Sequence, residues 1–313
     1  MKLRPVWNAI SDVVGVIGKM CLVATLSTGS TSAAAPSTLS SKTQTPEVFV
    51  LGTVHIDHLS PTMAYSFQDL IDIVTTINPD LICAEVYDRD YGTDMEGYYP
   101  PENPVIEFAA ESIGAEFFPS DWRGSKYEDE AAYKAMTDEE RQRFDALPKA
   151  HKELPADPKE RLEYIHAAET QKLIRESHEI RIAAGTEVAD GWWYSRNQII
   201  VKKCMRKAQK VGAQKILFTF GADHKYIIEE NVQKYYFIEA SKIPIPSVRN
   251  NNEMPSKIID HWRRNLRGLR KVRNGDRGSK EFRHMVRESG RIEDLKSCIK
   301  YDGLANPNVK GKL

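Results

Sequence analysis

Two stretches of the sequence decide the fold: VFVLGTVH at residues 48–55 and KILFTFGADH at residues 215–224. Each contains a continuous apolar run, which is typical of a strand that is buried on both faces of a parallel sheet. Each ends in Gly-x-x-His, where glycine allows the chain to turn sharply. Because the carboxyl ends of parallel strands form the ligand crevice of an open sheet, we expect His55 and His224 to lie at one edge.

The chain between these stretches alternates apolar runs with helical periodicity. We predict strands at 81–86 and 115–118, and helices at 60–77, 105–113 and 192–211. The first helix is expected to open at Ser60-Pro61, with proline in its first turn. This order predicts an α/β fold, in which a mostly parallel β-sheet is flanked by helices and the two Gly-x-x-His loops line one cleft.

Composition limits the class of protein. The 313 residues include 44 basic and 44 acidic side chains and are 41% hydrophobic, which excludes a disordered chain and a polytopic membrane protein. We expect an α/β domain over 46–250, with a charged helical insertion at 127–187, and a basic helical segment over 251–313. Acidic residues are interspersed in that segment, which favours a solvated amphipathic helix and no nucleic-acid partner.

The N-terminus has the layout of a secretory signal peptide. Positive residues, an apolar region and a small-residue stretch span 1–35, and a Ser/Thr-rich linker follows at 36–45. This order predicts a secreted, periplasmic or cell-envelope protein, with an amphipathic or transit-like segment as the alternative. The apolar run is shorter than the roughly 20 residues of a spanning helix, so no stable membrane span is expected.

The mature chain would retain three cysteines, which cannot all pair with one another. Cys83 and Cys204 lie in apolar surroundings, and we expect both to be small buried hydrophobic side chains. No CxxC spacing indicates a zinc or redox site.

Carboxylates also occur at strand ends. Glu85 closes the second strand and Asp121 follows the third, while Arg196 lies near the start of the helix before the last strand. Together with His55 and His224 they could reach one crevice. Two histidines and a carboxylate suit a divalent metal such as zinc or manganese, with His55, His224 and Glu85 as ligands. The same residues could instead act as acid/base groups without a metal.

These motifs resemble the TraB/GumN superfamily, whose relatives include Tiki-type metalloproteases, erythromycin esterases and ChaN-like haem-binding lipoproteins. The resemblance covers 48–229, apart from the charged insertion. It implies an α/β fold of two related halves with a polar cleft, and His55, Glu85 and His224 as the central site residues. Arg89, Asp121 and Arg196 match the family pattern more loosely. The family often has a glutamate beside the helix arginine, where this chain has Ser195.

Two functions follow from this site. The first is an exported hydrolase that acts on a small-molecule or peptide substrate, such as a peptide or an ester. A metal or the His/Glu set would activate water, and Arg196 would stabilise the oxyanion, with Glu85 and Asp121 as further catalytic residues. The alternative is a non-catalytic protein that binds or sequesters haem or a peptide, since histidine also suits haem iron.

Overall fold

Four parallel strands form one sheet, in the order β1-β4-β2-β3. The computed structural model describes residues 45–60, 65–124, 126–145, 158–245, 254–275 and 280–301. The strands are β1 (Glu47–Thr53), β2 (Leu81–Ala84), β3 (Glu116–Pro119) and β4 (Lys215–Gly221). The predicted mostly parallel sheet flanked by helices is therefore confirmed. The predicted signal peptide (1–35) and all of the predicted linker except its last residue lie outside the described residues.

The two apolar stretches form neighbouring strands, with β1 at the end of the strand order and β4 between β1 and β2. β1 pairs with β4 from Glu47 opposite Lys215 to Thr53 opposite Gly221. Because the two strands run parallel and in step, the loops after both of them leave the same edge of the sheet. The two Gly-x-x-His motifs continue there as short 3-10 helices, η1 (His55–Leu59) and η3 (Ala222–His224).

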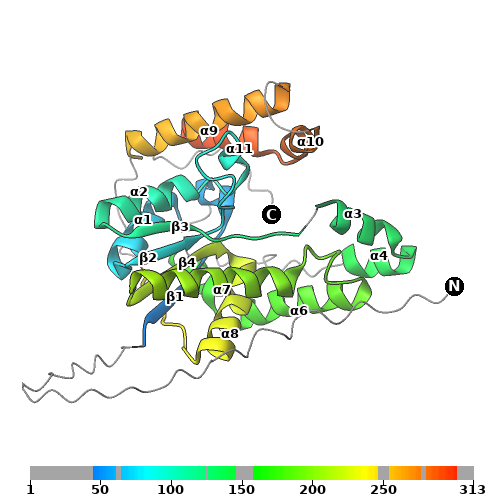
Figure 1. Ribbon diagram of the computed structural model, residues 1–313, viewed down its shortest axis with the longest axis horizontal. Helices are drawn as coiled ribbons and strands as arrows, with labels where there is room; N and C mark the ends of the chain where they lie inside the picture. The colour runs from blue at the N-terminus through cyan, green and yellow to red at the C-terminus, as the bar shows by residue number, and fades with distance from the viewer. Residues whose placement is uncertain are drawn as a thin grey trace, which may run out of the picture. The chain divides into compact units, whose positions relative to one another are not determined.

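Helices cover both faces of the sheet (Figure 1). On one face, side chains of β1, β2 and β4 pack with α1 (Phe67–Ile77) and α2 (Asn103–Ile113). On the other face, alternate side chains of these strands pack with α7 (Trp193–Val211) and α8 (Lys225–Tyr236). The continuous apolar runs are explained by this arrangement, since successive side chains enter two different cores.

The predicted start of the first helix is wrong. Ser60 is in an extended conformation, and α1 begins at Phe67. Ser66 caps it, accepting from the Asp69 backbone N–H while the Asp69 carboxylate accepts from the Ser66 N–H. This reciprocal capping box satisfies two backbone donors that would otherwise lack partners, and it overrides the weaker signal of Ser60-Pro61.

The charged insertion is mostly helical over its described residues, 127–145 and 158–187. It contains α3 (Lys126–Ala135), α4 (Asp138–Asp145), α5 (Pro158–His166) and α6 (Ala168–Ala184). His166 of α5 accepts a hydrogen bond at 3.0 Å from the backbone N–H of Gly52, near the end of β1. The insertion therefore contacts the edge of the sheet from which the histidine loops leave.

The basic C-terminal segment packs on the α1/α2 core. It forms α9 (Ser256–Asn274), α10 (Lys280–Glu288) and α11 (Arg291–Lys300). Trp262 of α9 is fully buried against Phe67, and its indole N–H donates to the Pro101 carbonyl at 2.8 Å. The apolar positions of α9 face this core, so its basic residues occupy the other side of the helix. None of the described helices is long and apolar enough to cross a membrane.

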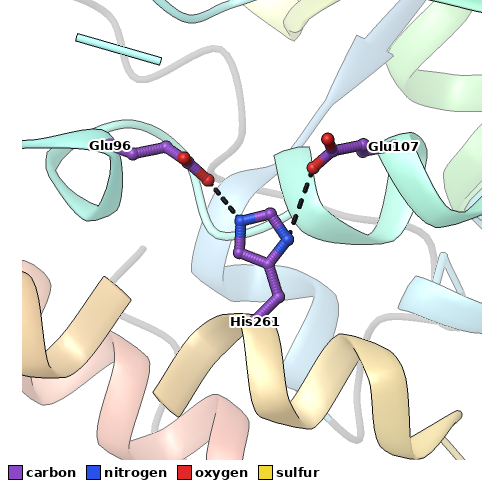
Figure 2. A group of neighbouring side chains, drawn as sticks. All are labelled: Glu96, Glu107 and His261. Atoms are coloured by element: carbon purple, nitrogen blue, oxygen red, sulfur yellow. Dashed lines mark hydrogen bonds and ion pairs between the residues drawn. The ribbon is translucent and has the colours of Figure 1, made fainter. Parts of the chain in front are cut away.

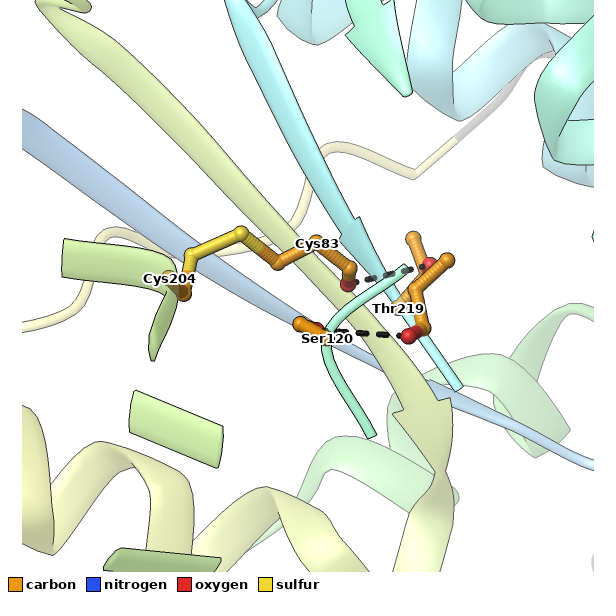
Figure 3. The surroundings of a disulfide bond; sticks show 5 residues. Cys83, Ser120, Cys204 and Thr219 are labelled. Atoms are coloured by element: carbon orange, nitrogen blue, oxygen red, sulfur yellow. Dashed lines mark hydrogen bonds between the residues drawn. A yellow bond between two sulfur atoms is a disulfide. The ribbon is translucent and has the colours of Figure 1, made fainter. Parts of the chain in front are cut away.

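Cys83 and Cys204 are joined by a disulfide bond (Figure 3). The expectation that they are separate hydrophobic side chains is therefore wrong, although both are fully buried. α7 packs across the sheet so that Cys204 meets Cys83 of β2, with their Cα atoms 5.9 Å apart. The two residues are 121 positions apart, and this proximity arises only from the tertiary packing of α7.

Candidate functional site

Three histidines line one cavity of about 470 Å³ at the carboxyl edge of the sheet. His55 and His224 come from the two Gly-x-x-His loops, and His178 comes from α6 of the insertion. Glu85 and Arg196 line the same cavity. The structure therefore brings together four of the five candidate residues from the sequence, His55, Glu85, Arg196 and His224. The fifth, Asp121, hydrogen-bonds Arg196.

Each of the three histidines is fixed through its Nδ1 atom. The partners are the carboxylates of Glu102 and Asp190 and the amide oxygen of Asn197, which bind His55, His178 and His224 at 2.8, 2.6 and 2.7 Å, respectively. Within the described part of the chain, none of the three Nε2 atoms makes a hydrogen bond. A fixed ring with a free second nitrogen is the arrangement found in catalytic and in metal-binding histidines.

The hydrogen-bond partners of Asn197 determine the tautomer of His224. The Asn197 side-chain NH₂ donates to the Trp193 carbonyl at 2.7 Å, so its oxygen is left to accept from Nδ1–H of His224. Nε2 then carries a lone pair, 3.9 Å from Oε1 of Glu85. Burial lowers the pKa of His224 well below 6.5, and the nearby Arg196 charge adds to this effect. His224 is therefore a neutral imidazole whose acceptor atom faces Glu85.

His55 is charged at neutral pH. Burial lowers its pKa, but the charge and hydrogen bond of Glu102 and the charge of Glu85 outweigh that effect and raise it to about 9. For Glu102, burial raises the pKa, but the interactions with His55 prevail and lower it to about 2. The two side chains therefore form an ion pair in which Nε2 of His55 is a protonated donor.

The backbone of His55 is strained, with φ at +52°. For a residue with a side chain this left-handed conformation costs roughly 1 to 3 kcal/mol, and such strain concentrates at functional sites. Gly221 of the opposite loop makes room for the ring, because a Cβ atom at Gly221 would lie 2.9 Å from Nε2 of His55. The glycine of the second motif therefore determines where the histidine of the first motif can lie.

Glu85 lies between these two histidines and Arg196. Its Oε2 accepts from the Gly221 backbone N–H at 2.7 Å, and its Oε1 accepts from Nη2 of Arg196 at 3.3 Å. Burial raises the pKa of Glu85, and the Asp121 charge adds to this, whereas His55 and Arg196 oppose it. A carboxylate with a raised pKa is a stronger base than an ordinary glutamate.

Arg196 is held by a two-pronged pair with Asp121. Its Nε and Nη2 atoms donate to the two oxygens of that carboxylate, both at 2.9 Å. The charges of Asp121 and Glu85 overcome the effect of burial and raise the pKa of Arg196 further above its ordinary value. Because its Nε and Nη2 atoms bind these carboxylates, Arg196 holds the Glu85 carboxylate in place at the wall of the cavity. Arg89, matched loosely in the resemblance, is largely exposed and stacks on Tyr87.

The sequence analysis did not single out His178. The His178 ring stacks on Trp193, with centroids 3.7 Å apart and planes 5° apart. The Asp190 carboxylate binds Nδ1 of His178 and also pairs with Arg181 at 3.3 Å. His178 is in a charged helical segment and follows no strand, so nothing in the sequence connects it to the sheet edge. Only the docking of α6 brings it to the cavity.

The expected metal ligands do not form a close donor group. Among the described residues, the one set of three acidic, histidine or cysteine side chains whose donor atoms lie within 4.8 Å of one another is Glu96, Glu107 and His261. His55, Glu85 and His224 line the same cavity, but they do not meet this criterion. A zinc ion with bond lengths of about 2 Å to each ligand would require them to move closer together.

Figure 2 shows the Glu96, Glu107 and His261 group, which links α9 to η2 (Glu96–Tyr98) and α2. Nε2 of His261 meets Glu96, and Nδ1 meets Glu107 at 3.3 Å. Glu96 also accepts from the Gly92 backbone N–H at 2.8 Å. The two carboxylates contact opposite nitrogens of the His261 ring, and a single ion cannot bind both nitrogens of one imidazole. This geometry fits a structural bridge between the C-terminal helices and the sheet domain.

No protein-family model, no curated protein and no solved structure matches the chain.

Proposed function

We propose that the protein is a hydrolase of esters or peptides that uses the His/Glu site without a metal. The observation that carries this proposal is the setting of Glu85, a basic carboxylate beside a neutral imidazole, His224, and near a charged one, His55. A base, a water-orienting acceptor and a donor for the oxyanion can together promote hydrolysis of a carbonyl compound.

In the proposed reaction, Glu85 accepts a proton from water while the lone pair on Nε2 of His224 accepts a hydrogen bond from the same water. The hydroxide attacks the substrate carbonyl, and the oxyanion that forms is stabilised by Nε2–H of His55. Glu85 then returns the proton to the leaving alcohol or amine, so the carboxylate is regenerated. Arg196 and Asp121 act as positioning residues that keep the Glu85 carboxylate in place.

This assignment changes the role that the sequence suggested for Arg196. The sequence indicated that Arg196 would stabilise the oxyanion, but its Nε and Nη2 atoms bind Asp121 and Glu85. His55 is the better candidate for that task, because its free Nε2 carries a proton at neutral pH. We also propose a site without zinc or manganese, because a metal bound to Nε2 of His55 would have to displace this proton.

The disulfide supports the proposal that the protein is exported. Disulfides persist in oxidising compartments and are rare in the reducing cytosol. The Cys83–Cys204 bond joins β2, which leads to Glu85, to α7, which carries Arg196. An oxidising environment would therefore preserve the link between the two elements that position the proposed base.

The pH dependence of turnover tests this proposal. A panel of nitrophenyl esters and short blocked peptides is first used to find a substrate. Turnover should rise as Glu85 ionises, at a pH above the ordinary 4.5, and should fall as His55 loses its proton near pH 9. In Glu102→Gln the alkaline limb should move down by about 1 to 3 pH units, because the carboxylate that raises the His55 pKa is gone.

The control is Glu111→Gln, which removes an exposed carboxylate from α2, the helix that begins directly after Glu102. Its profile should match that of the wild-type protein. An alkaline limb that stays in place in Glu102→Gln would contradict the role given to His55. Binding of panel compounds without any turnover would contradict the hydrolase and favour the ligand-binding alternative.

A further inference from the structure

A second cavity, of about 880 Å³, adjoins the histidine cavity. Glu85, Asp121, Arg123 and Arg196 belong to its wall, and three of these four residues also line the histidine cavity. Six aromatic side chains contribute to the rest of the wall, together with charged residues such as Glu128 and Arg291, and we call this space the aromatic chamber. Its aromatic residues are Tyr87, Tyr98, Tyr99, Trp122, Trp192 and Phe282.

The aromatic residues come from separate parts of the chain. Tyr87 follows β2, Trp122 follows β3, Trp192 precedes α7 and Phe282 lies on α10. Ring contacts connect some of them, with centroids 5.4 Å apart for Tyr87 and Tyr99. Trp122 and Trp192 are 6.4 Å apart in an edge-to-face arrangement. Tyr87, Trp122 and Trp192 adjoin β2, β3 and α7, which also position Glu85, Asp121 and Arg196, so the chamber is built beside the proposed base.

Trp192 is held in an unusual conformation at the wall of the chamber. Its φ is +61°, which is costly for a residue with a bulky side chain. Gly124 is the reason its indole fits, because a Cβ atom at Gly124 would lie 2.2 Å from the indole nitrogen. That buried N–H meets no acceptor within the described part of the chain. Unsatisfied buried donors are rare in folded proteins, so Trp192 combines an unusual backbone with an unsatisfied side chain at the wall of the chamber.

Size and chemistry together indicate the kind of group that the chamber takes. Its volume lies within the range of pockets that enclose whole small molecules, about 300 to 1,000 Å³. Flat aromatic walls favour a planar aromatic group, which can stack or meet a ring edge. Charged residues line the chamber beside the histidine cavity, at Glu85, Arg123 and Arg196, and also elsewhere, as at Arg89 and Arg291. Because the proposed base Glu85 belongs to both walls, the carbonyl of such a substrate would lie toward it.

We infer that the aromatic chamber is a specificity subsite for an aromatic side group next to the scissile carbonyl, as in an ester or amide of an aromatic amino acid. This inference rests on the proposed hydrolase for its catalytic part. Its binding part is independent, because the chamber walls include residues that the reaction does not use.

The test separates binding from turnover in the full chain. Binding of N-acetyl-L-tyrosinamide and N-acetyl-L-alaninamide is measured by ligand-observed NMR, and hydrolysis of the corresponding ethyl esters is followed in parallel. Since the tyrosine ring can contact several aromatic side chains of the chamber and the alanine methyl group cannot, the tyrosine ligand should bind about tenfold more tightly than the alanine ligand. For the esters this preference should be expressed in KM.

Gly124→Ala should remove most of this preference, because the new methyl group displaces the Trp192 indole. Trp122→Leu is the second variant, and it removes a ring without changing the backbone at Gly124. Tyr235→Ala is the matched control, since Tyr235 is an exposed aromatic residue of α8 that lines neither cavity. Its preference should equal that of the wild-type chain.

Equal binding of the two amides, or an undiminished preference in both folded chamber variants, would overturn the inference. Preferential binding of the tyrosine amide with no hydrolysis of either ester would support the subsite and overturn the proposed hydrolase. The two failures are therefore distinguishable.

Discussion

Glu85→Gln is expected to lower turnover by a factor of about 10² to 10⁴, the usual contribution of a general acid–base group. The glutamine can still accept the hydrogen bond from the Gly221 backbone N–H, so the loop after β4 keeps its contact. What it lacks is the negative charge that takes a proton from water. We therefore expect a loss in kcat with little change in KM, measured on the best substrate of the panel.

The matched control for this variant is Glu116→Gln at the start of β3, where the carboxylate is exposed and pairs with Lys207. It should retain full turnover. Circular dichroism and thermal unfolding check that both variants are folded. A folded Glu85→Gln protein with wild-type turnover would show that this carboxylate is not the base.

Removal of the disulfide should have the largest effect on stability. Replacing Cys83 and Cys204 together with alanine should lower the free energy of unfolding by about 2 to 5 kcal/mol, as for native disulfides in general. The bond closes a loop of 121 residues, so its loss greatly increases the freedom of the unfolded chain. Denaturant unfolding of the oxidised wild-type protein and the double variant measures the difference.

Cys298→Ala provides the control, because Cys298 is a buried free cysteine and its replacement deletes a sulfur atom without breaking a cross-link. Its effect should be clearly smaller than that of the double variant. Equal unfolding free energies for the double variant and the wild-type protein would show that the disulfide does not form in solution.

The sequence predicted the sheet because its signals are local. The apolar runs of β1 and β4 are unbroken, and each ends in a glycine, so strand identity and direction follow from a few adjacent residues. The start of α1 was mispredicted because two local signals competed. Pro61 suggested a first turn, whereas the reciprocal hydrogen bonds of Ser66 and Asp69 determine where the helix begins.

The site was predictable only in part, for a related reason. His55, Glu85 and His224 follow strands whose carboxyl ends share an edge, so their convergence could be inferred from topology. Their hydrogen-bond partners could not be inferred in this way. Glu102 and Asn197 lie on other elements; Glu102 raises the pKa of His55, and the Asn197 oxygen selects the tautomer of His224. The pairing of Cys83 with Cys204 likewise depends on how α7 packs against the sheet.

Catalysis by His55, Glu85 and His224 without a metal is the central proposal for this site. The measurement that tests this most directly is turnover of the best panel substrate by chelator-treated, dialysed wild-type protein whose metal content is determined by elemental analysis. We predict undiminished turnover at a metal content far below one ion per chain, and no gain on adding zinc or manganese. Loss of turnover on chelation, restored by either ion in the wild-type protein but not in His55→Ala or His224→Ala, would contradict it.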